Sequence, residues 1–145
     1  MPVFVKSVVI DAPVETVFGF HEREDALRLL TPRFPPVRVV NKSGGLAPGS
    51  RVELRVIFFH WIALHTAYER HRLFVDEQIR GPFAEWIHRH EFEPVGGKTR
   101  LTDRVSYRLP GGALVNAAFG WMIRIGLHRM FLHRHKVTKQ FCEKG

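Results

Sequence analysis

The sequence predicts an α+β fold in which a curved antiparallel sheet wraps around a long C-terminal helix. A Val- and Phe-rich strand at residues 4–10 precedes two short helical segments. A run of strand-like segments with short separators then fills residues 51–109. Residues 113–141 contain no proline and place apolar residues at helical spacing. The concave side of a curved sheet must be filled, and this last helix is the only predicted element large enough to fill it.

Composition is typical of one globular domain, expected to span residues 1–145. The single cysteine, Cys142, excludes an intrachain disulfide and argues against a cysteine-based metal site. The N-terminus lacks signal-peptide architecture and no stretch is long and apolar enough to span a membrane, so we expect a cytoplasmic protein. The net charge of +8 permits attraction to phosphates, anionic lipids or acidic partners, or is simply a basic surface. No phosphate-binding loop, dinucleotide fingerprint or nucleic-acid-binding motif accompanies that charge, so we expect no cofactor and no nucleic-acid partner.

The N-terminal third is expected to form a strand, two short helices and a second strand. Pro13 suits the first turn of a helix, where its missing N–H has no intrahelical partner to lose, and Asp11 suits the positive helix end. A second short helix at residues 23–30 stops at Pro32. A loop then enters a strand within residues 33–41, and the Gly- and Pro-rich residues 42–50 form a turn region.

The middle of the chain predicts antiparallel strands joined by short turns at residues 69–71, 81–82 and 95–97. Alternation in residues 61–69 places His65 on one face and Tyr68 on the other. In residues 72–79 the apolar count favours Glu77 inward over Asp76, but a one-residue change of register reverses this. The predicted strands are residues 51–59, 61–69, 72–79, 81–94 and 99–109.

The strand within residues 81–94 has one face that mixes aromatic and imidazole side chains. Trp86, His88, His90 and Phe92 share this face because residues two apart point to the same side of a strand. The other face is mostly charged, so the mixed face is expected to be concave. A few polar groups on an apolar wall orient a bound ligand, which makes His88 and His90 candidate pocket residues. They are alternatively core residues bonded to a neighbouring strand, or residues at the wet rim of the sheet.

The last predicted strand adds Asp103 among apolar residues that share its face. A buried carboxylate is costly unless it is paired, and His88 or His90 on the adjacent strand is the expected partner. Such a pair is a candidate acid/base unit, although we favour a purely structural hydrogen bond.

Two histidines on one strand face also resemble a two-ligand metal arrangement. His88 and His90 offer this arrangement, and His128 and His135 form a more widely spaced pair on the helix. The sequence offers no clear third ligand, so we expect no metal.

The C-terminal helix carries one apolar stripe expected to face inward: Val115, Phe119, Met122, Gly126, Met130, His133, Val137 and Phe141. Gly126 lacks a side chain, which opens space for a ligand or lets a strand approach closely, at a cost of about 1 kcal/mol relative to alanine.

The far face of this helix carries Trp121, Ile125, His128, Leu132 and His135. Flanked by Arg124, Arg129 and Lys136, its Trp-Ile-Leu strip could dock on a membrane surface or a protein partner. The alternative is that the first helices or a loop cover this strip.

Three segments in this order resemble the START/SRPBCC superfamily, the helix-grip fold of the birch-pollen allergen. They are IDAPVETVFGF at 10–20, FVDEQIRGPFAEWIHRHEFEP at 74–94 and TRLTDRVSYRLPGG at 99–112. The middle segment resembles a bacterial ligand-binding branch labelled polyketide cyclase/dehydrase-like or coenzyme-Q-binding-like. The resemblance implies a hydrophobic cavity between sheet and helix. Members bind lipids, polyketides, quinones or hormones, and a minority catalyse cyclisation or dehydration.

We therefore predict a carrier or sensor of a small hydrophobic ligand, such as a lipid, polyketide or quinone, in preference to an enzyme. The alternative is a cyclase/dehydratase acting on a polyketide-like carbonyl compound, with His88, His90 and Asp103 as acid/base groups that must converge within hydrogen-bond reach. The candidate ligand contacts are Trp86, His88, His90, Phe92, Asp103, Phe119, Met122, Gly126, Met130 and His133.

Overall fold

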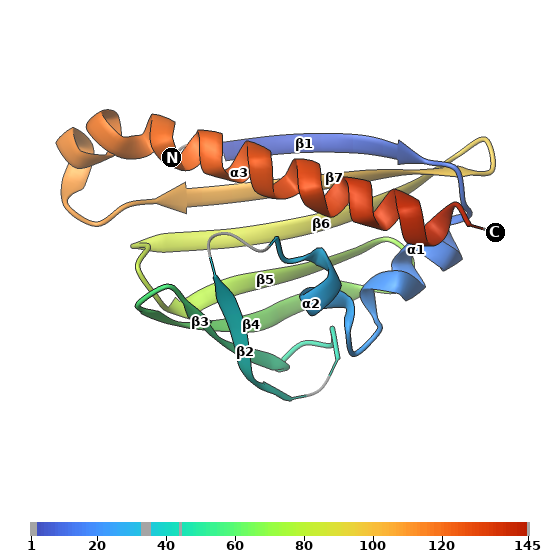
Figure 1. Ribbon diagram of the computed structural model, residues 1–145, viewed down its shortest axis with the longest axis horizontal. Coiled ribbons are helices and arrows are strands. Elements are labelled where there is room, and N and C mark those ends of the chain that lie inside the picture. Colours follow the sequence, from blue (N-terminus) through green and yellow to red (C-terminus); the bar gives the residue numbers. More distant parts are fainter. Residues whose placement is uncertain (1–2, 33–35, 44, 145) are drawn as a thin grey trace.

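The computed structural model describes residues 3–32, 36–43 and 45–144. Its order of elements is the one predicted, with one strand and two short helices ahead of a run of strands and a long last helix (Figure 1). The elements are β1 Val3–Ile10, α1 Val14–His21, α2 Ala26–Leu30, β2 Val37–Ser43, β3 Arg51–Val56, β4 Phe59–Glu69, β5 Leu73–Arg80, β6 Glu85–Val95, β7 Lys98–Arg108 and α3 Gly112–Cys142. The predicted loop at residues 33–35 lies outside the described part of the chain.

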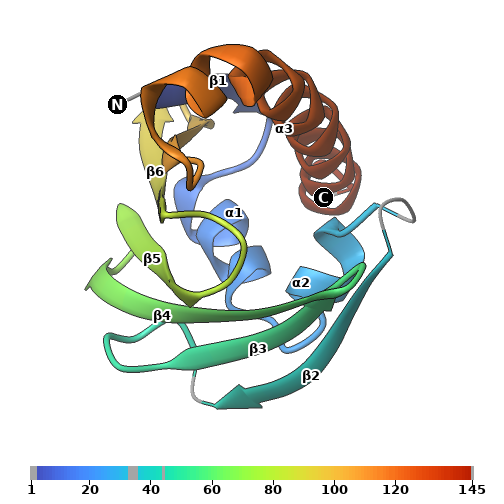
Figure 2. The same ribbon diagram turned by 90° about the vertical axis from the view of Figure 1, so that its left-hand side faces the viewer.

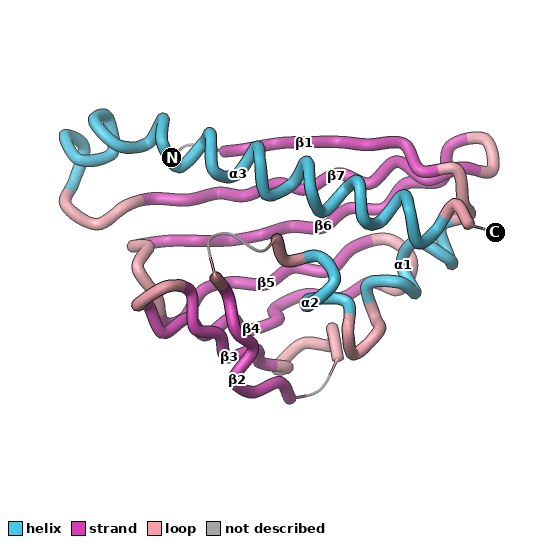
Figure 3. The backbone as a smooth tube through the Cα atoms, viewed as in Figure 1, coloured by secondary structure: helices cyan, strands magenta, loops and turns pink. Residues whose placement is uncertain are grey.

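All seven strands form one antiparallel sheet in the order β1-β7-β6-β5-β4-β3-β2. Figure 2 shows the sheet curling around α1 and α2, with α3 running along the β1 side. Figure 3 shows the same elements coloured by type, with the strands of the sheet separate from the helices. The curvature gives the sheet a concave side, which the helices fill. The predicted helix-grip fold is confirmed.

Two strand predictions fail where the backbone is irregular. The predicted strand at 51–59 is interrupted after Val56, because Ile57 adopts a left-handed φ of 57° and starts the tight turn into β4. A β-bulge between His65 and Ala67 shifts the register of β4 against β5. Tyr68 therefore points to the concave side and packs edge-on against Phe18 of α1, contrary to the prediction for its face.

The register of β5 also differs from the favoured prediction, since Asp76 rather than Glu77 faces inward. Asp76 is paired across the strands with His88 and hydrogen-bonds to His90. The apolar count was misleading because Ile79 lies half-exposed near the strand end, while Asp76 is stabilised inside by imidazole partners.

The inward stripe of α3 is one residue away from the predicted one. Its buried members are Leu127, Phe131, His135, Thr138 and Cys142. Phe119 and Met122 are each 51% exposed and Gly126 is also exposed, so their predicted inward placement is wrong; Met130 and His133 are half-buried beside the packed stripe.

Length explains why the first half of α3 is not packed. A helix of 31 residues is about 46 Å long, whereas the longest strands, of 11 residues, reach only about 37 Å. The first turns of α3 accordingly project past the ends of β1 and β7 (Figure 1). The C-terminal half packs over β1 and beside α1 and α2, where the buried stripe lies. No helix in the described ranges is long and apolar enough to cross a bilayer.

Candidate functional site

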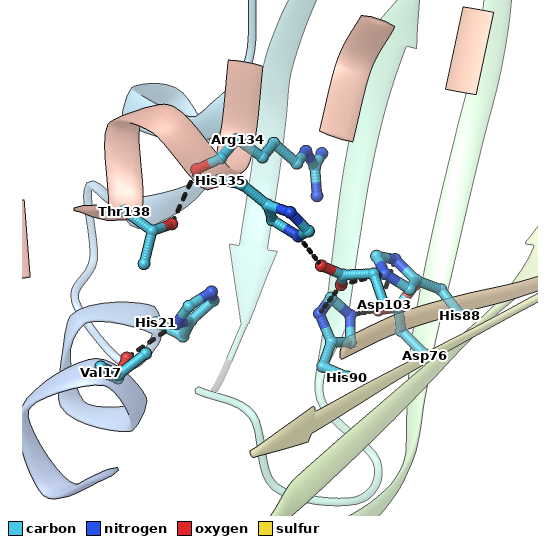
Figure 4. Close-up of polar contacts among 9 residues, drawn as sticks. All are labelled: Val17, His21, Asp76, His88, His90, Asp103, Arg134, His135 and Thr138. Carbon is cyan, nitrogen blue, oxygen red and sulfur yellow. Dashed lines mark hydrogen bonds and ion pairs between the residues drawn. The ribbon is translucent and has the colours of Figure 1, made fainter. Parts of the chain in front are cut away.

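A buried carboxylate on β7 is the centre of the site. Asp103 Oδ1 accepts a hydrogen bond from His88 Nε2 at 2.8 Å, and its Oδ2 accepts one from His135 Nε2 at 2.7 Å. The Nδ1 atom of His90 lies 3.3 Å from the same Oδ1. Three imidazoles from β6 and α3 therefore converge on one carboxylate (Figure 4). The expected partnership of Asp103 with the strand histidines is confirmed.

A second carboxylate extends this cluster onto β5. His90 Nε2 donates to Asp76 Oδ2 at 2.8 Å, and His88 Nδ1 lies 4.0 Å from the same oxygen. The two imidazoles are stacked, with ring centroids 3.6 Å apart. Cross-strand pairing sets this arrangement, because Asp76 pairs with His88 and Asp103 with His90 in the sheet register. We call Asp76, His88, His90, Asp103 and His135 the polar cluster.

Imidazole contacts keep both carboxylates of the polar cluster ionised. Burial alone would raise the pKa of Asp103, but the hydrogen bonds from His135, His88 and His90 hold it well below its ordinary value. For Asp76, the bond from His90 and the charges of His88 and His90 overcome burial and lower the pKa to about 2. The site is thus a pair of buried negative charges bridged by imidazoles.

The two strand histidines differ in basicity. Burial disfavours the charged form of His90, but its contacts with Asp103 and Asp76 outweigh this effect and raise its pKa. Burial and repulsion from His90 dominate for His88, whose pKa is lowered despite the bond to Asp103. His90 is therefore the more basic of the two imidazoles, and His88 is the less basic one. This difference is what a proton-transfer site requires.

The polar cluster is enclosed by aromatic side chains. Phe74 stacks on His90 with centroids 3.9 Å apart, and Phe131 of α3 meets His88 edge-on at 5.1 Å. Trp86 and Phe92 are buried on the same concave face, as alternation predicted. Three buried side-chain nitrogens in the described part of the chain lack a hydrogen-bond partner: His65 Nδ1, Arg134 Nε and His135 Nδ1. Such atoms are unusual in a protein core, and an ordered water molecule or a further polar group would satisfy each of them.

His21 is a separate buried imidazole on α1. Its Nδ1 donates to the carbonyl oxygen of Val17 at 2.9 Å (Figure 4). Its ring meets Phe92 edge-on, with centroids 5.1 Å apart. Burial among these apolar groups lowers the pKa of His21 to about 4. The His21 side chain is consequently neutral near pH 7.

Two surface grooves flank the packed part of the molecule. One, of about 610 Å³, lies between β1 and α3 and is lined by charged residues such as Lys6, Lys139 and Glu143. The other, of about 710 Å³, lies between α2 and β2, around Leu27 and Val39. Neither is lined by the face that carries Trp86 and His88.

Sequence reasoning found three of the five members of the polar cluster, namely His88, His90 and Asp103. It missed Asp76, for which the signal was its alternation with Phe74, and placed His135 on the far face of the helix. His135 is instead buried, because the packed stripe of α3 is rotated by one residue. The predicted exposure of Trp121, Ile125 and Leu132 on that far face is confirmed.

The sequence matches a family model described as polyketide cyclase / dehydrase and lipid transport over residues 10–133. The chain belongs to this polyketide cyclase/dehydrase and lipid transport family. Its matched region includes β5, β6 and β7, which carry the strand members of the polar cluster, and most of α3. At the level of this family, the function is the binding of hydrophobic ligands or cyclase/dehydrase-type chemistry. No curated protein matches the sequence.

Several solved structures share the fold of this family member. The nucleoside-diphosphate sugar epimerase from Corynebacterium glutamicum is 26% identical with a TM-score of 0.74, over 94% of this chain and 28% of that one. The chain thus spans little more than a quarter of that relative. The Zhui aromatase/cyclase from Streptomyces sp. R1128 shares the fold at 11% identity and a TM-score of 0.74, over 99% and 94% of the two chains. A START superfamily protein from Mycobacterium smegmatis shares the fold at 15% identity and a TM-score of 0.68, over 98% of this chain and 97% of that one.

Proposed function

We propose that the chain binds a small, mostly apolar ligand on the concave face of the sheet, with the polar end of the ligand beside Asp76 and His65. The observation that carries this proposal is the accessibility of Asp76. Its side chain keeps 17% of its surface exposed, against 5% for His88. Asp76 is therefore where the buried polar cluster meets the accessible part of the concave face.

The apolar part of this binding surface lies on β3 and β4. Leu54 and Trp61 are direct cross-strand partners there, and both are half-buried. Val52 and Ala63 form the next pair on the same face and are buried. Because α3 packs mainly against β1, α1 and α2, a ligand on this half of the sheet does not compete with the packed stripe of the helix. A lipid, polyketide or quinone has the required apolar body and oxygen-bearing end.

The polar end of the ligand has a natural partner in His65. His65 is paired with Asp76 across β4 and β5, and its buried Nδ1 has no hydrogen-bond partner. Burial lowers the pKa of His65, so its imidazole is neutral and offers either one donor or one acceptor at that position. A carbonyl or hydroxyl group of the ligand would satisfy this nitrogen, which otherwise costs about 1–3 kcal/mol to bury unpaired.

Two neighbouring residues of β3 test this placement. We expect Leu54→Trp to weaken binding of an environment-sensitive naphthalene dye at least about tenfold, since the larger ring occupies the apolar surface that the dye would otherwise bury. Arg55→Trp adds the same ring to the convex face and is the matched control. Displacement of the dye by a fatty acid and by a short-chain quinone is measured in parallel.

Equal dye affinity in folded Leu54→Trp and Arg55→Trp proteins would place the ligand elsewhere. Gly126→Leu is expected to leave the affinity unchanged as well, because Gly126 is exposed and an added Cβ meets no atom within 4 Å.

A cyclase/dehydratase is the second candidate function, and the convergence of His88, His90 and Asp103 favours it. Neutral His88 would take a proton from the carbon beside a carbonyl of a polyketide-like compound, and the resulting enolate carbon would bond to a second carbonyl carbon. His90 would give a proton to the new alkoxide. The protonated His88 would then give its proton to the new hydroxyl, which leaves as water, while His90 takes the second proton of the attacking carbon and a C=C bond forms. Loss of turnover with retained dye binding in His88→Gln supports this function, whereas absence of turnover of poly-β-carbonyl compounds by the unaltered protein excludes it.

The exposed first half of α3 supports a further proposal, that the chain docks on anionic membrane. Leu114 and Trp121 are 85% and 60% exposed, and Phe58 in the β3–β4 turn is 88% exposed. Figure 1 places this turn and the first turns of α3 at the same end of the molecule. Arg124 and Arg129 are exposed on the same helix, and the whole chain carries a net charge of +8. Exposed aromatic and aliphatic side chains beside arginines suit an anionic lipid surface.

Vesicle flotation tests this docking surface. We expect binding to vesicles of phosphatidylcholine with one quarter phosphatidylserine at low salt, and loss of most binding as salt rises through the physiological range, because the attraction is screened. Trp121→Ser should weaken binding several-fold, whereas Val9→Ser, which removes a half-exposed side chain from β1, should not. Absence of vesicle binding at low salt overturns the proposal, and salt-independent self-association in sedimentation would assign the surface to a second copy of the chain.

A further inference from the structure

We infer that Asp76, His88 and His90 form a binding site for a divalent transition-metal ion, with zinc the best match to the donor set. One carboxylate oxygen and one nitrogen of each imidazole lie within 4.8 Å of one another. Asp76 Oδ2 is 2.8 Å from His90 Nε2 and 4.0 Å from His88 Nδ1. Ligand atoms of a tetrahedral zinc ion with bonds of 2.0–2.1 Å are about 3.3 Å apart, a value between these two distances.

Asp103 occupies the position of an outer carboxylate for both histidine ligands. The nitrogen of each ring that does not face Asp76 faces Asp103, at 2.8 Å for His88 Nε2 and 3.3 Å for His90 Nδ1. Metal-bound imidazoles usually donate their remaining N–H to a carboxylate, which fixes the tautomer and the ring orientation. His135 in turn holds the second oxygen of Asp103. The Asp103 carboxylate thus orients two ligands, and His135 of α3 fixes the position of that carboxylate.

Donor and acceptor counts in the polar cluster call for positive charge between the two carboxylates, supplied either by a second proton on His90 or by a metal ion on the Asp76 side. His90 has a carboxylate oxygen at each of its two nitrogens, yet a neutral imidazole has only one N–H to donate. His88 likewise lies between Asp103 and the more distant Asp76. A metal ion on the Asp76 side takes the lone pair of one nitrogen of each ring, and the other nitrogen then donates to Asp103. Both ring nitrogens of His88 and of His90 then have a partner.

The site has a route to solvent and one coordination position that these residues leave free. The side chain of Asp76 is partly exposed, and the half-buried Trp61 and Gln78 lie on the same concave face. The rings of His88 and His90 are stacked, so each must turn about its Cβ–Cγ bond to direct a nitrogen at one ion. With three protein ligands, a fourth position remains for water or for the oxygen of a bound molecule. Ligation would occupy the nitrogens that the second candidate function assigns to proton transfer.

Metal titration of the purified chain tests this inference without any organic ligand. After removal of metal with a chelator, we expect calorimetry with ZnCl₂ to give one tight equivalent per chain. His88→Gln should weaken it at least about 100-fold, and Asp103→Asn, which alters only the outer carboxylate, about 10- to 100-fold. The matched control is His60→Gln, because His60 also contacts a carboxylate, Glu53, at the surface between β3 and β4. Its zinc affinity should equal that of the unaltered chain.

Nitrogen-15 spectra of the histidine rings in the unaltered protein guard against variants that fail to fold. One equivalent of zinc should shift the ring nitrogens of His88 and His90 and leave those of His60 unchanged. Zinc binding that is absent, or that is weakened equally by His60→Gln and His88→Gln, or that shifts His60 rather than the β6 histidines, overturns the inference.

Discussion

Replacing Asp103 by asparagine is expected to lower the free energy of unfolding by about 3–5 kcal/mol. The change removes the one buried negative charge that accepts hydrogen bonds from His88 and His135 and contacts His90. The new amide presents N–H donors to imidazoles that are themselves donors, which leaves buried groups unpaired. Urea unfolding at pH 7 measures the loss.

Glu91→Gln is the matched control for this substitution. Glu91 lies on the neighbouring strand and accepts from Arg104 and Arg89 on the solvent side of the sheet, so its neutralisation should cost less than about 1 kcal/mol. His135→Gln combined with Asp103→Asn should cost clearly less than the two single losses together, since both break the same contact. Strict additivity, or equal losses for Asp103→Asn and Glu91→Gln, would contradict a cooperative buried cluster.

Acidification between pH 6.5 and 4 is expected to destabilise the protein through His21. The pKa of this imidazole falls from an ordinary value of 6.5 to about 4 on folding. Within this window the unfolded chain binds a proton that the folded chain does not, so stability falls as pH falls. The difference of 2.5 units corresponds to about 3 kcal/mol once the pH has dropped below 4.

The groups facing His21 set the size of this effect. Burial is the largest cause of its lowered pKa, and the hydrogen bond to the Val17 carbonyl opposes it. Repulsion from His90 and Arg134 lowers the pKa further, whereas attraction to Asp103 raises it. His21→Gln keeps a donor for the Val17 carbonyl without a titrating ring, and should flatten the slope of unfolding free energy against pH in this window. His128→Gln, on the exposed face of α3, should not. An unchanged slope in His21→Gln would assign the acid sensitivity to other residues.

Alternation and turn residues were sufficient to predict most of the sheet and its concave face. The strands β6 and β7 are regular over 11 residues each, so the facing of Trp86, His88 and Asp103 could be predicted by counting in twos. Counting failed in β4, where a bulge near His65 reverses the faces beyond it. A bulge has no consistent residue signature, and its consequence appears only when the partner strand is in place.

The sequence by itself determined the helix-grip order of elements and the face that joins His88, His90 and Asp103, because strand alternation is a local property and a buried carboxylate requires a partner. Tertiary structure alone decided that Asp76 and His135 complete the polar cluster. Asp76 depends on the register of β5 against β6, and His135 on the rotation of α3 over the sheet. A helix turns about 100° per residue, so an apolar stripe chosen one position away exposes Phe119 and Met122 and buries His135 instead. That rotation is set by which side chains meet β1, α1 and α2, contacts between segments far apart in the chain.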